Sequence, residues 1–238
     1  MGNACDDRAA ARNLQPCPPR WSGDAGAVAA GAGAAFIGLV VLLQWLRGDL
    51  DWIDAQLSAY LHGAHGLLLR TAYCLLAATM AWLALGLYAA LAPVACSRTV
   101  VGLFWMAALG LSAVAIGDSW MPVLAPNAAK MVHVLSADLA FLCVIAAVLL
   151  QSWYFRRDRL WRQYFAPLFG LGLLAFALLL FHVTVISAPP GISQKSAIVS
   201  IVAWMVLVGV QLAHYVRAQA ARLPHSRDNA RVNQPEEV

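Results

Sequence analysis

The sequence predicts an all-α integral membrane protein, a bundle of six transmembrane helices. Hydrophobic residues make up 61% and charged residues 12% of the 238, whereas soluble domains have about 45–50% and about 25%. The apolar residues gather in six long runs between Ala25 and Arg217. Each run has the roughly 20 residues that a helix needs to cross a bilayer. A soluble domain of this length could not bury six such helices, which excludes a water-soluble fold.

The first span is expected at residues 25–47. It is longer than the apolar core of a signal peptide, which has about 7–15 residues, and no small-residue cleavage site follows it. We therefore expect it to be retained. Within it, Gly26, Ala30 and Ala34 repeat every four residues, a spacing that lets a neighbouring helix approach closely. Packing within the chain is the default expectation, and a homodimer contact is the alternative.

The connection that follows, residues 48–66, is the longest on its side of the membrane. Its apolar residues, such as Ile53 and Leu57, recur at helical spacing, and polar residues fall largely on the other face. The pattern predicts a short amphipathic helix lying on the outer leaflet. Such a helix either seals the outer face of the bundle, which we favour, or forms a lid over an enclosed site.

The remaining spans and the domain limits follow from the same hydropathy pattern. Further spans are expected at 67–92, 99–118, 131–154, 165–187 and 195–216. The membrane domain then covers residues 25–217. A cytoplasmic arm at 1–24 and a tail at 218–238 are expected to be disordered, because their polar composition cannot form a core.

Lysine and arginine residues set the orientation, because cytoplasmic segments carry the excess of positive charge. One side holds 12 of the 16: Arg8, Arg12, Arg20, Arg98, Arg156, Arg157, Arg159, Arg162, Arg217, Arg222, Arg227 and Arg231. The other side has only Arg47, Arg70, Lys130 and Lys195. We therefore expect both termini in the cytoplasm and the protein in the cell inner (plasma) membrane. The charges flank the spans and form no single patch, so the net charge of +4 does not indicate nucleic acid.

Polar residues from four spans are expected at a similar depth near the outer face. They are Asp118, His133, Asp138, His182, Gln194 and Lys195. An ionisable residue inside a span costs about 2.5–3.5 kcal/mol, so each is a functional candidate. Asp138 lies eight residues beyond Lys130, about 10–12 Å into the membrane at helical rise. It must be protonated, paired or in a wet cavity. Together the six residues predict an outward-facing polar pocket.

Lys195 and the two histidines each have alternative roles. A lysine in the first turn of a helix, beside free backbone N–H groups, suits an anionic ligand, but we rank a salt bridge to Asp118 or Asp138 first. His133 and His182 could together ligate the iron of haem b, the less favoured alternative, and no cofactor is predicted. A hydrolase could use His133 as its general base, oriented by Asp118 or Asp138. The sequence does not decide whether the protein is an enzyme.

Short motifs give the chain a resemblance to a known family. They are Leu57-Ser58-Ala59-Tyr60, Gly117-Asp118, His133 and Gly191-Ile192-Ser193-Gln194-Lys195. In these the chain resembles the domain of unknown function 998 over roughly residues 30–216, with Lys195 where an arginine is expected. Lysine lacks the fork that lets arginine bind a phosphate bidentately. The resemblance implies a six-span bundle in a prokaryotic membrane and no established activity.

Three kinds of function are the main candidates, and a transporter is a further one that the absence of Gly- or Pro-broken spans at matched positions disfavours. The first is binding or processing of a lipid or small amphipathic molecule, with membrane lipid as partner and an anionic lipid or other small molecule as the possible ligand. The second is a di-histidine haem redox protein. The third is a structural or assembly protein in which the polar residues only hold helices together. The oligomeric state is not indicated by the sequence.

Overall fold

The computed structural model describes residues 18–185 and 187–232, without the side chains of residues 118–122, 124, 126, 127 and 222–232. The described part is helical and contains no strand. Its long helices are α2 (Arg20–Leu46), α3 (Gly66–Ala90), α4 (Arg98–Leu124), α5 (Pro126–Phe155), α6 (Phe165–Thr184) and α7 (Pro190–Val232). Six helices of the described chain are long and apolar enough to cross a membrane. The predicted all-α six-helix bundle is thereby confirmed.

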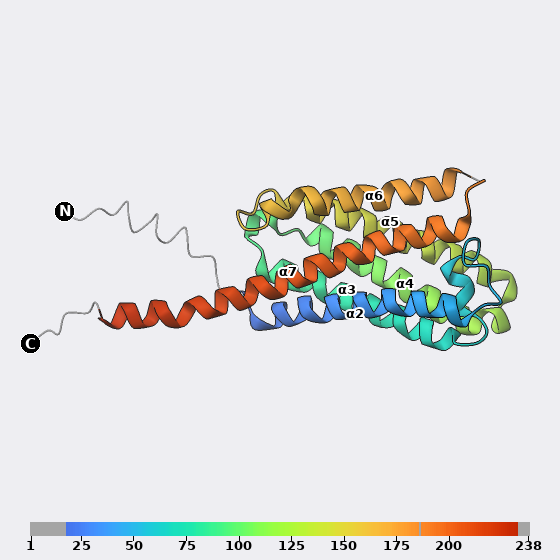
Figure 1. Cartoon of the computed structure of the whole chain (residues 1–238), viewed down its shortest axis with the longest axis horizontal. Coiled ribbons are helices and arrows are strands. Elements are labelled where there is room, and N and C mark those ends of the chain that lie inside the picture. Colours follow the sequence, from blue (N-terminus) through green and yellow to red (C-terminus); the bar gives the residue numbers. More distant parts are fainter. Residues whose placement is uncertain (1–17, 186, 233–238) are drawn as a thin grey trace, which may run out of the picture.

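The six helices run along the long axis of the molecule (Figure 1). The start of α2 and the C-terminal part of α7 lie at one end, which we call the terminal end. The connection 47–65, the end of α6, the start of α7 and the turn between α4 and α5 lie at the other, which we call the distal end. α2 packs against α3 and α7, α4 against α3 and α5, and α6 against α5 and α7. This order encloses a space between α2, α3, α4, α5 and α7.

The predicted close approach of the first span to a neighbour is confirmed, and the neighbour is α7. A Cβ on Gly26 would lie 2.5 Å from the carbonyl oxygen of Gly209, and a Cβ on Gly209 would lie 2.5 Å from that of Gly26. Ala30 packs against the same glycine, whereas Ala34 is exposed. Glycine at both positions is therefore required for the two backbones to touch.

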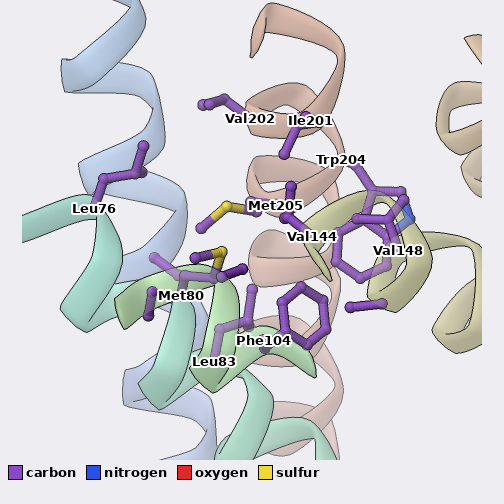
Figure 2. Packing of buried hydrophobic residues seen from close by; sticks show 14 of the residues in the cluster. Leu76, Met80, Leu83, Phe104, Val144, Val148, Ile201, Val202, Trp204 and Met205 are labelled. Carbon is purple, nitrogen blue, oxygen red and sulfur yellow. The ribbon is translucent and has the colours of Figure 1, made fainter. Parts of the chain in front are cut away.

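Four of the long helices form much of the apolar core. Figure 2 shows α3, α4, α5 and α7 contributing apolar side chains to it. Trp204 is fully buried, stacks on Phe104 with ring centroids 5.9 Å apart, and donates from Nε1 to Ser152 Oγ at 2.8 Å. The hydrogen bond satisfies the indole N–H, which would otherwise be costly in this apolar interior.

Asp158 ties two connections together at the terminal end. Its side chain is 3% exposed. One oxygen accepts from the backbone N–H groups of Leu160 and Trp161, and the other accepts from that of Ala92 at 3.2 Å. A buried carboxylate is stable here because backbone donors surround it.

The helix limits differ from the predicted spans mainly at prolines, at the chain ends and at the end of α4, which continues to Leu124, six residues beyond the predicted end at 118. α5 begins at Pro126 and α7 at Pro190, each about five residues before the predicted start, because proline is favoured in the first helical turn. α2 begins at Arg20, inside the arm predicted to be disordered, and α7 continues to Val232, beyond the predicted tail boundary at residue 218. Residues 1–17 and 233–238 lie outside the described part.

The connection between α2 and α3 corrects one prediction. In place of an amphipathic helix on the outer leaflet, it contains turns and the five-residue 3₁₀ helix η1 (Leu57–Leu61). Leu57, Tyr60 and Leu61 are at most 1% exposed, so η1 is inserted into the bundle. The physical reason is that backbone N–H and C=O groups of this connection, which a helix would pair internally, form hydrogen bonds with α7 instead. Gly63 and His65, at φ 76° and 65°, then reverse the chain into α3.

Candidate functional site

A cavity of about 100 Å³ lies between five of the six long helices and η1. Most of its wall is apolar, formed by Phe36, Leu76, Met80, Ala107, Leu111, Val114, Ala137, Ala140, Phe141, Val144, Ile198, Ile201, Val202 and Met205. Its polar lining residues are Ser58, Tyr73, His133 and Gln194. None of the described lining residues is charged. The cavity is therefore apolar along most of its length, which differs from the polar pocket expected from the sequence.

The polar lining residues lie toward the distal end. Ser58 belongs to η1, Gln194 to the first turns of α7 and His133 to the first part of α5. Met205 follows Gln194 by eleven residues on the same helix, which is about 16 Å at helical rise. The cavity thus extends from a polar distal end to an apolar inner end.

Two of these polar groups have unused hydrogen-bonding capacity. Gln194 Oε1 accepts from the backbone N–H of Leu57 at 2.9 Å. Because an N–H donor identifies its partner as the amide oxygen, the amide nitrogen of Gln194 must point elsewhere. Within the described residues, neither that nitrogen nor the Ser58 hydroxyl has a hydrogen-bond partner. Unused donors at one end of an apolar cavity are suited to the polar group of an amphipathic molecule.

Adjacent residues of α7 bind the connection between α2 and α3, and we call this set of contacts the clasp. Lys195 Nζ donates to the carbonyl oxygen of Trp52 at 2.7 Å and to Gln44 Oε1 at 3.3 Å. The Ile192 N–H donates to the carbonyl oxygen of Ile53 at 3.0 Å. A Cβ on Gly191 would lie 2.5–2.6 Å from carbonyl oxygens of this segment. Only glycine allows this approach.

The clasp continues through Tyr60 to Arg47. Lys195 Nζ lies 5.2 Å from the centroid of the Tyr60 ring, and the Arg47 guanidinium lies 6.0 Å from it. Both distances are within the range of cation–π attraction. Burial raises the pKa of the Tyr60 phenol, whose oxygen is buried and forms no hydrogen bond within the described residues.

Arg47 in turn holds both ends of the connection. Its guanidinium donates to both carboxylate oxygens of Asp49, each at 2.8 Å, and to the carbonyl oxygens of His62 and Ala64. The hydrogen bond to Asp49 raises the pKa of Arg47, and the same bond lowers the pKa of Asp49. The bidentate geometry makes this a strong, directional contact.

His182 is bound by protein groups on both ring nitrogens. Nδ1 lies 2.8 Å from Ser193 Oγ, and Nε2 lies 3.5 Å from Gln56 Nε2. Ser193 Oγ is also 3.0 Å from the carbonyl oxygen of Pro189. A consistent assignment has the serine donating to that carbonyl and accepting from Nδ1–H, while Nε2 accepts from Gln56. Ser193 is 4% exposed, which makes it a structural hydroxyl rather than an accessible nucleophile.

These contacts fit poorly with a haem held between His133 and His182. An iron ligand needs a ring nitrogen free to coordinate, and those of His182 both face protein partners. A cavity of about 100 Å³ is also smaller than the roughly 150 Å³ cavity that accommodates benzene, and a haem macrocycle is far larger. Within the described residues, no three His, Cys, Asp or Glu side chains are grouped to hold a metal ion.

The structure divides the six predicted site residues among different environments. His133 and Gln194 line the cavity, whereas His182 and Lys195 make the contacts described above. The Asp138 side chain is exposed on α5 and has no hydrogen bond or ion pair within the described residues. The side chain of Asp118 lies outside the description. For Lys195 the sequence favoured a salt bridge to Asp118 or Asp138. Among the described groups, its ammonium instead donates hydrogen bonds to Gln44 and to the carbonyl oxygen of Trp52.

Sequence reasoning missed the contributions of Gln44, Gln56 and Ser58 to these contacts. The first two are uncharged, so a search for ionisable residues inside spans passes over them. Ser58 and Gln194 do fall in the short motifs that carried the family resemblance, and those motifs were the available signal. Each residue of the motif at 191–195 has a role in these contacts. Gly191, Ile192, Gln194 and Lys195 contact the connection between α2 and α3, and Ser193 contacts His182.

Comparison with known proteins places the chain in a family without assigning an activity. No match was found among curated proteins or among solved structures. The family model for proteins of unknown function, DUF998, matches residues 29–211. The matched region covers well over half of the chain and includes the clasp, the cavity walls and at least part of each of the six spans. On this evidence the chain belongs to the DUF998 family.

Proposed function

We propose that this multi-pass membrane protein binds an amphipathic molecule, with the apolar part in the intramembrane cavity and the polar part at its distal end. One observation carries the proposal: the apolar cavity ends at unused hydrogen-bonding groups of Ser58 and Gln194. Ligand sites are typically apolar concavities with a few polar groups that fix orientation. The same arrangement has no evident role in helix packing, because cavities cost stability.

The proposed membrane is the plasma membrane, with the distal end facing outward. The excess of Lys and Arg in the segments at the terminal end supports this orientation. Aromatic contacts there are of the kind found at membrane interfaces: Arg156 lies 4.1 Å from the centroid of the Trp153 ring, and Arg157 lies 5.2 Å from that of Tyr154. A ligand would then enter from the outer leaflet.

The test is native mass spectrometry of the protein purified from membranes in mild detergent. Ala107 lines the cavity and is 1% exposed, so Ala107→Leu should fill the space and remove a co-purifying amphipathic molecule. Ala78 is exposed on α3, so Ala78→Leu is the matched control and should retain it. A co-purifying molecule that survives Ala107→Leu in a folded protein would contradict the proposal.

A second candidate, a purely structural role, has a specific observation in its favour. The ammonium group of Lys195, the strongest candidate for an anion site, has its contacts supplied by Gln44, Trp52 and Tyr60. The clasp therefore needs no ligand to be satisfied. If the protein only scaffolds, the wild-type chain should carry no stoichiometric ligand in the same mass spectra.

A further inference from the structure

We infer that the connection between α5 and α6 binds the head group of an anionic phospholipid in the leaflet at the terminal end. This connection joins Phe155 to Phe165. We call it the arginine turn, because it contains Arg156, Arg157, Arg159 and Arg162. It lies at the opposite end of the bundle from the clasp (Figure 1). The inference therefore goes beyond the proposed function and does not depend on it.

The arginine turn presents positive charge that its own carboxylate does not neutralise. All four arginine side chains are exposed. The carboxylate in the turn, that of Asp158, is 3% exposed and accepts hydrogen bonds from backbone N–H groups. Among the described residues, none of the four arginines forms an ion pair. Clustered basic residues next to a membrane span attract anionic lipid head groups, each adding to the attraction.

The guanidinium of Arg156 is positioned before any lipid binds. It lies 4.1 Å from the centroid of the Trp153 ring on α5 and 5.3 Å from that of Phe165 on α6. Both distances are within the range of cation–π attraction. Its N–H groups form no hydrogen bond within the described part of the chain, so they can donate to phosphate oxygens in the fork geometry that suits arginine. Less ordering entropy is then lost on binding.

The backbone of the turn is also held in place. Trp161 is 2% exposed and stacks on Phe155 with ring centroids 4.6 Å apart. One oxygen of Asp158 accepts from the N–H groups of Leu160 and Trp161, and the other ties the turn to Ala92. The arginines are therefore carried by an anchored turn, which a specific binding site requires.

The apolar surface beside the arginines favours a lipid over a soluble phosphate compound. Trp153 is 43% exposed and Leu160 is 42% exposed. The Trp153 ring also contacts those of Phe165 and Phe169, at centroid distances of 6.1 and 5.8 Å. Arginine beside exposed aromatic rings at the end of a span is the composition found at the level of lipid head groups. The acyl chains of a bound lipid would lie against these rings, which a free phosphate could not use.

The experiment compares three probes on the full-length protein after delipidation in detergent. The probes are dioleoylphosphatidylglycerol, dioleoylphosphatidylcholine and inorganic phosphate. The two lipids share their acyl chains and differ in the net charge of the head group. Native mass spectrometry measures the bound fraction of each lipid. We expect phosphatidylglycerol to bind about five- to tenfold more tightly than phosphatidylcholine, and an equal concentration of inorganic phosphate not to displace it.

Two replacements of Arg156 test the contact to the head group. Arg156→Gln removes the charge and should raise the Kd for phosphatidylglycerol about three- to tenfold, with little change for phosphatidylcholine. Arg156→Lys keeps the charge without the planar fork and should restore part of the affinity. Arg217→Gln is the matched control, because it removes the same charge at an exposed position of α7 and should leave the ratio of the two Kd values unchanged. A purely structural role of Arg156 would lower stability without changing that ratio.

Three outcomes would overturn the inference. The first is equal binding of the two lipids by the wild-type chain, which is expected if acidic residues outside the described part, such as Asp6 or Glu236, occupy the arginines. The second is an equal effect of Arg156→Gln and Arg217→Gln, which would indicate net charge and no site. The third is displacement of phosphatidylglycerol by inorganic phosphate.

The result is independent of the cavity. A phospholipid with two acyl chains is far larger than a cavity of about 100 Å³. Phosphatidylglycerol bound at the arginine turn should therefore be retained by Ala107→Leu and weakened by Arg156→Gln. Its retention in Ala107→Leu supports the inference and leaves the proposed function untouched, whereas its loss would place the lipid elsewhere and overturn the inference.

Discussion

Lys195 Nζ donates a hydrogen bond of 2.7 Å to the backbone carbonyl oxygen of Trp52, so the first turn of α7 holds the connection between α2 and α3 in place. A lysine at a helix start opposes the helix dipole. The carbonyl of Trp52, the amide of Gln44 and the face of Tyr60 offset that cost by surrounding the ammonium group with partial negative charge. The clasp therefore holds the connection that leads into η1, whose Ser58 lines the cavity.

Replacing Lys195 with methionine should destabilise the protein. Lys195→Met keeps much of the side-chain volume but leaves the Trp52 carbonyl and the Gln44 amide without their donor. The expected loss in the free energy of unfolding is about 1.5–3 kcal/mol, the usual contribution of hydrogen bonds to a charged group. SDS titration in mixed micelles measures it. Lys130→Met, at an exposed position, is the control and should change the free energy little.

Adding one methyl group to Gly191 should be more harmful than adding one to an open glycine. In Gly191→Ala the new Cβ would meet the carbonyl oxygens of Ile53 and Ala55 at 2.6 and 2.5 Å, and these backbone atoms cannot move aside cheaply. Overpacking of this kind costs about 1–3 kcal/mol. Gly31→Ala, where nothing lies within 4 Å, is the matched control. Equal stability of the two variants in the same titration would show that the close approach is absent.

The Arg47–Asp49 pair should make the connection sensitive to acid. Because the hydrogen bond from Arg47 lowers the pKa of Asp49, the pair stabilises the folded connection above the ordinary aspartate pKa of about 4. That stabilisation is lost as the pH falls through the lowered folded-state value. Hydrogen exchange at residues 60–66, corrected for the intrinsic effect of pH, should accelerate on acidification. Asp49→Asn should show fast exchange already at neutral pH and little further change.

Asp158 should be the most sensitive carboxylate outside the spans. Asp158→Ala removes the acceptor of three backbone N–H groups, those of Ala92, Leu160 and Trp161. Each buried donor left without a partner costs about 1–3 kcal/mol, and solvent entry will reduce the sum. We expect a lower free energy of unfolding and faster proteolysis at 91–97 and 156–164. Asp54→Ala, at an exposed position, should leave both unchanged.

The fold was predictable because one physical requirement dominates it. In lipid every backbone group must be satisfied within its own helix, so length and hydropathy alone identify the spans. The Gly26 and Ala30 spacing likewise predicted a close helix contact, since small residues are the usual means of achieving one in a membrane. The partner, Gly209 on α7, could not be identified, because hydropathy carries no information about which helices are neighbours.

The site was less predictable because depth along a helix does not determine direction around it. Asp138, His133 and Lys195 were expected at similar depths, yet Asp138 is exposed, His133 lines the cavity and Lys195 belongs to the clasp. The groups that complete the contacts are uncharged side chains and backbone carbonyls, such as Gln44 and Trp52. Backbone carbonyls have no signature in the sequence, and a non-helical connection inserted into the bundle exposes them to a neighbouring helix.

The most direct test of ligand binding in the cavity is the position of a bound chain. A short alkanol that carries a photoreactive diazirine in its chain can be bound, activated by light and located by peptide mass spectrometry. The account predicts labelling of residues at the inner end of the cavity, such as Met80, Val144 and Met205. Labelling confined to exposed residues such as Leu142 and Leu207 would contradict it, because the chain would then lie outside the bundle.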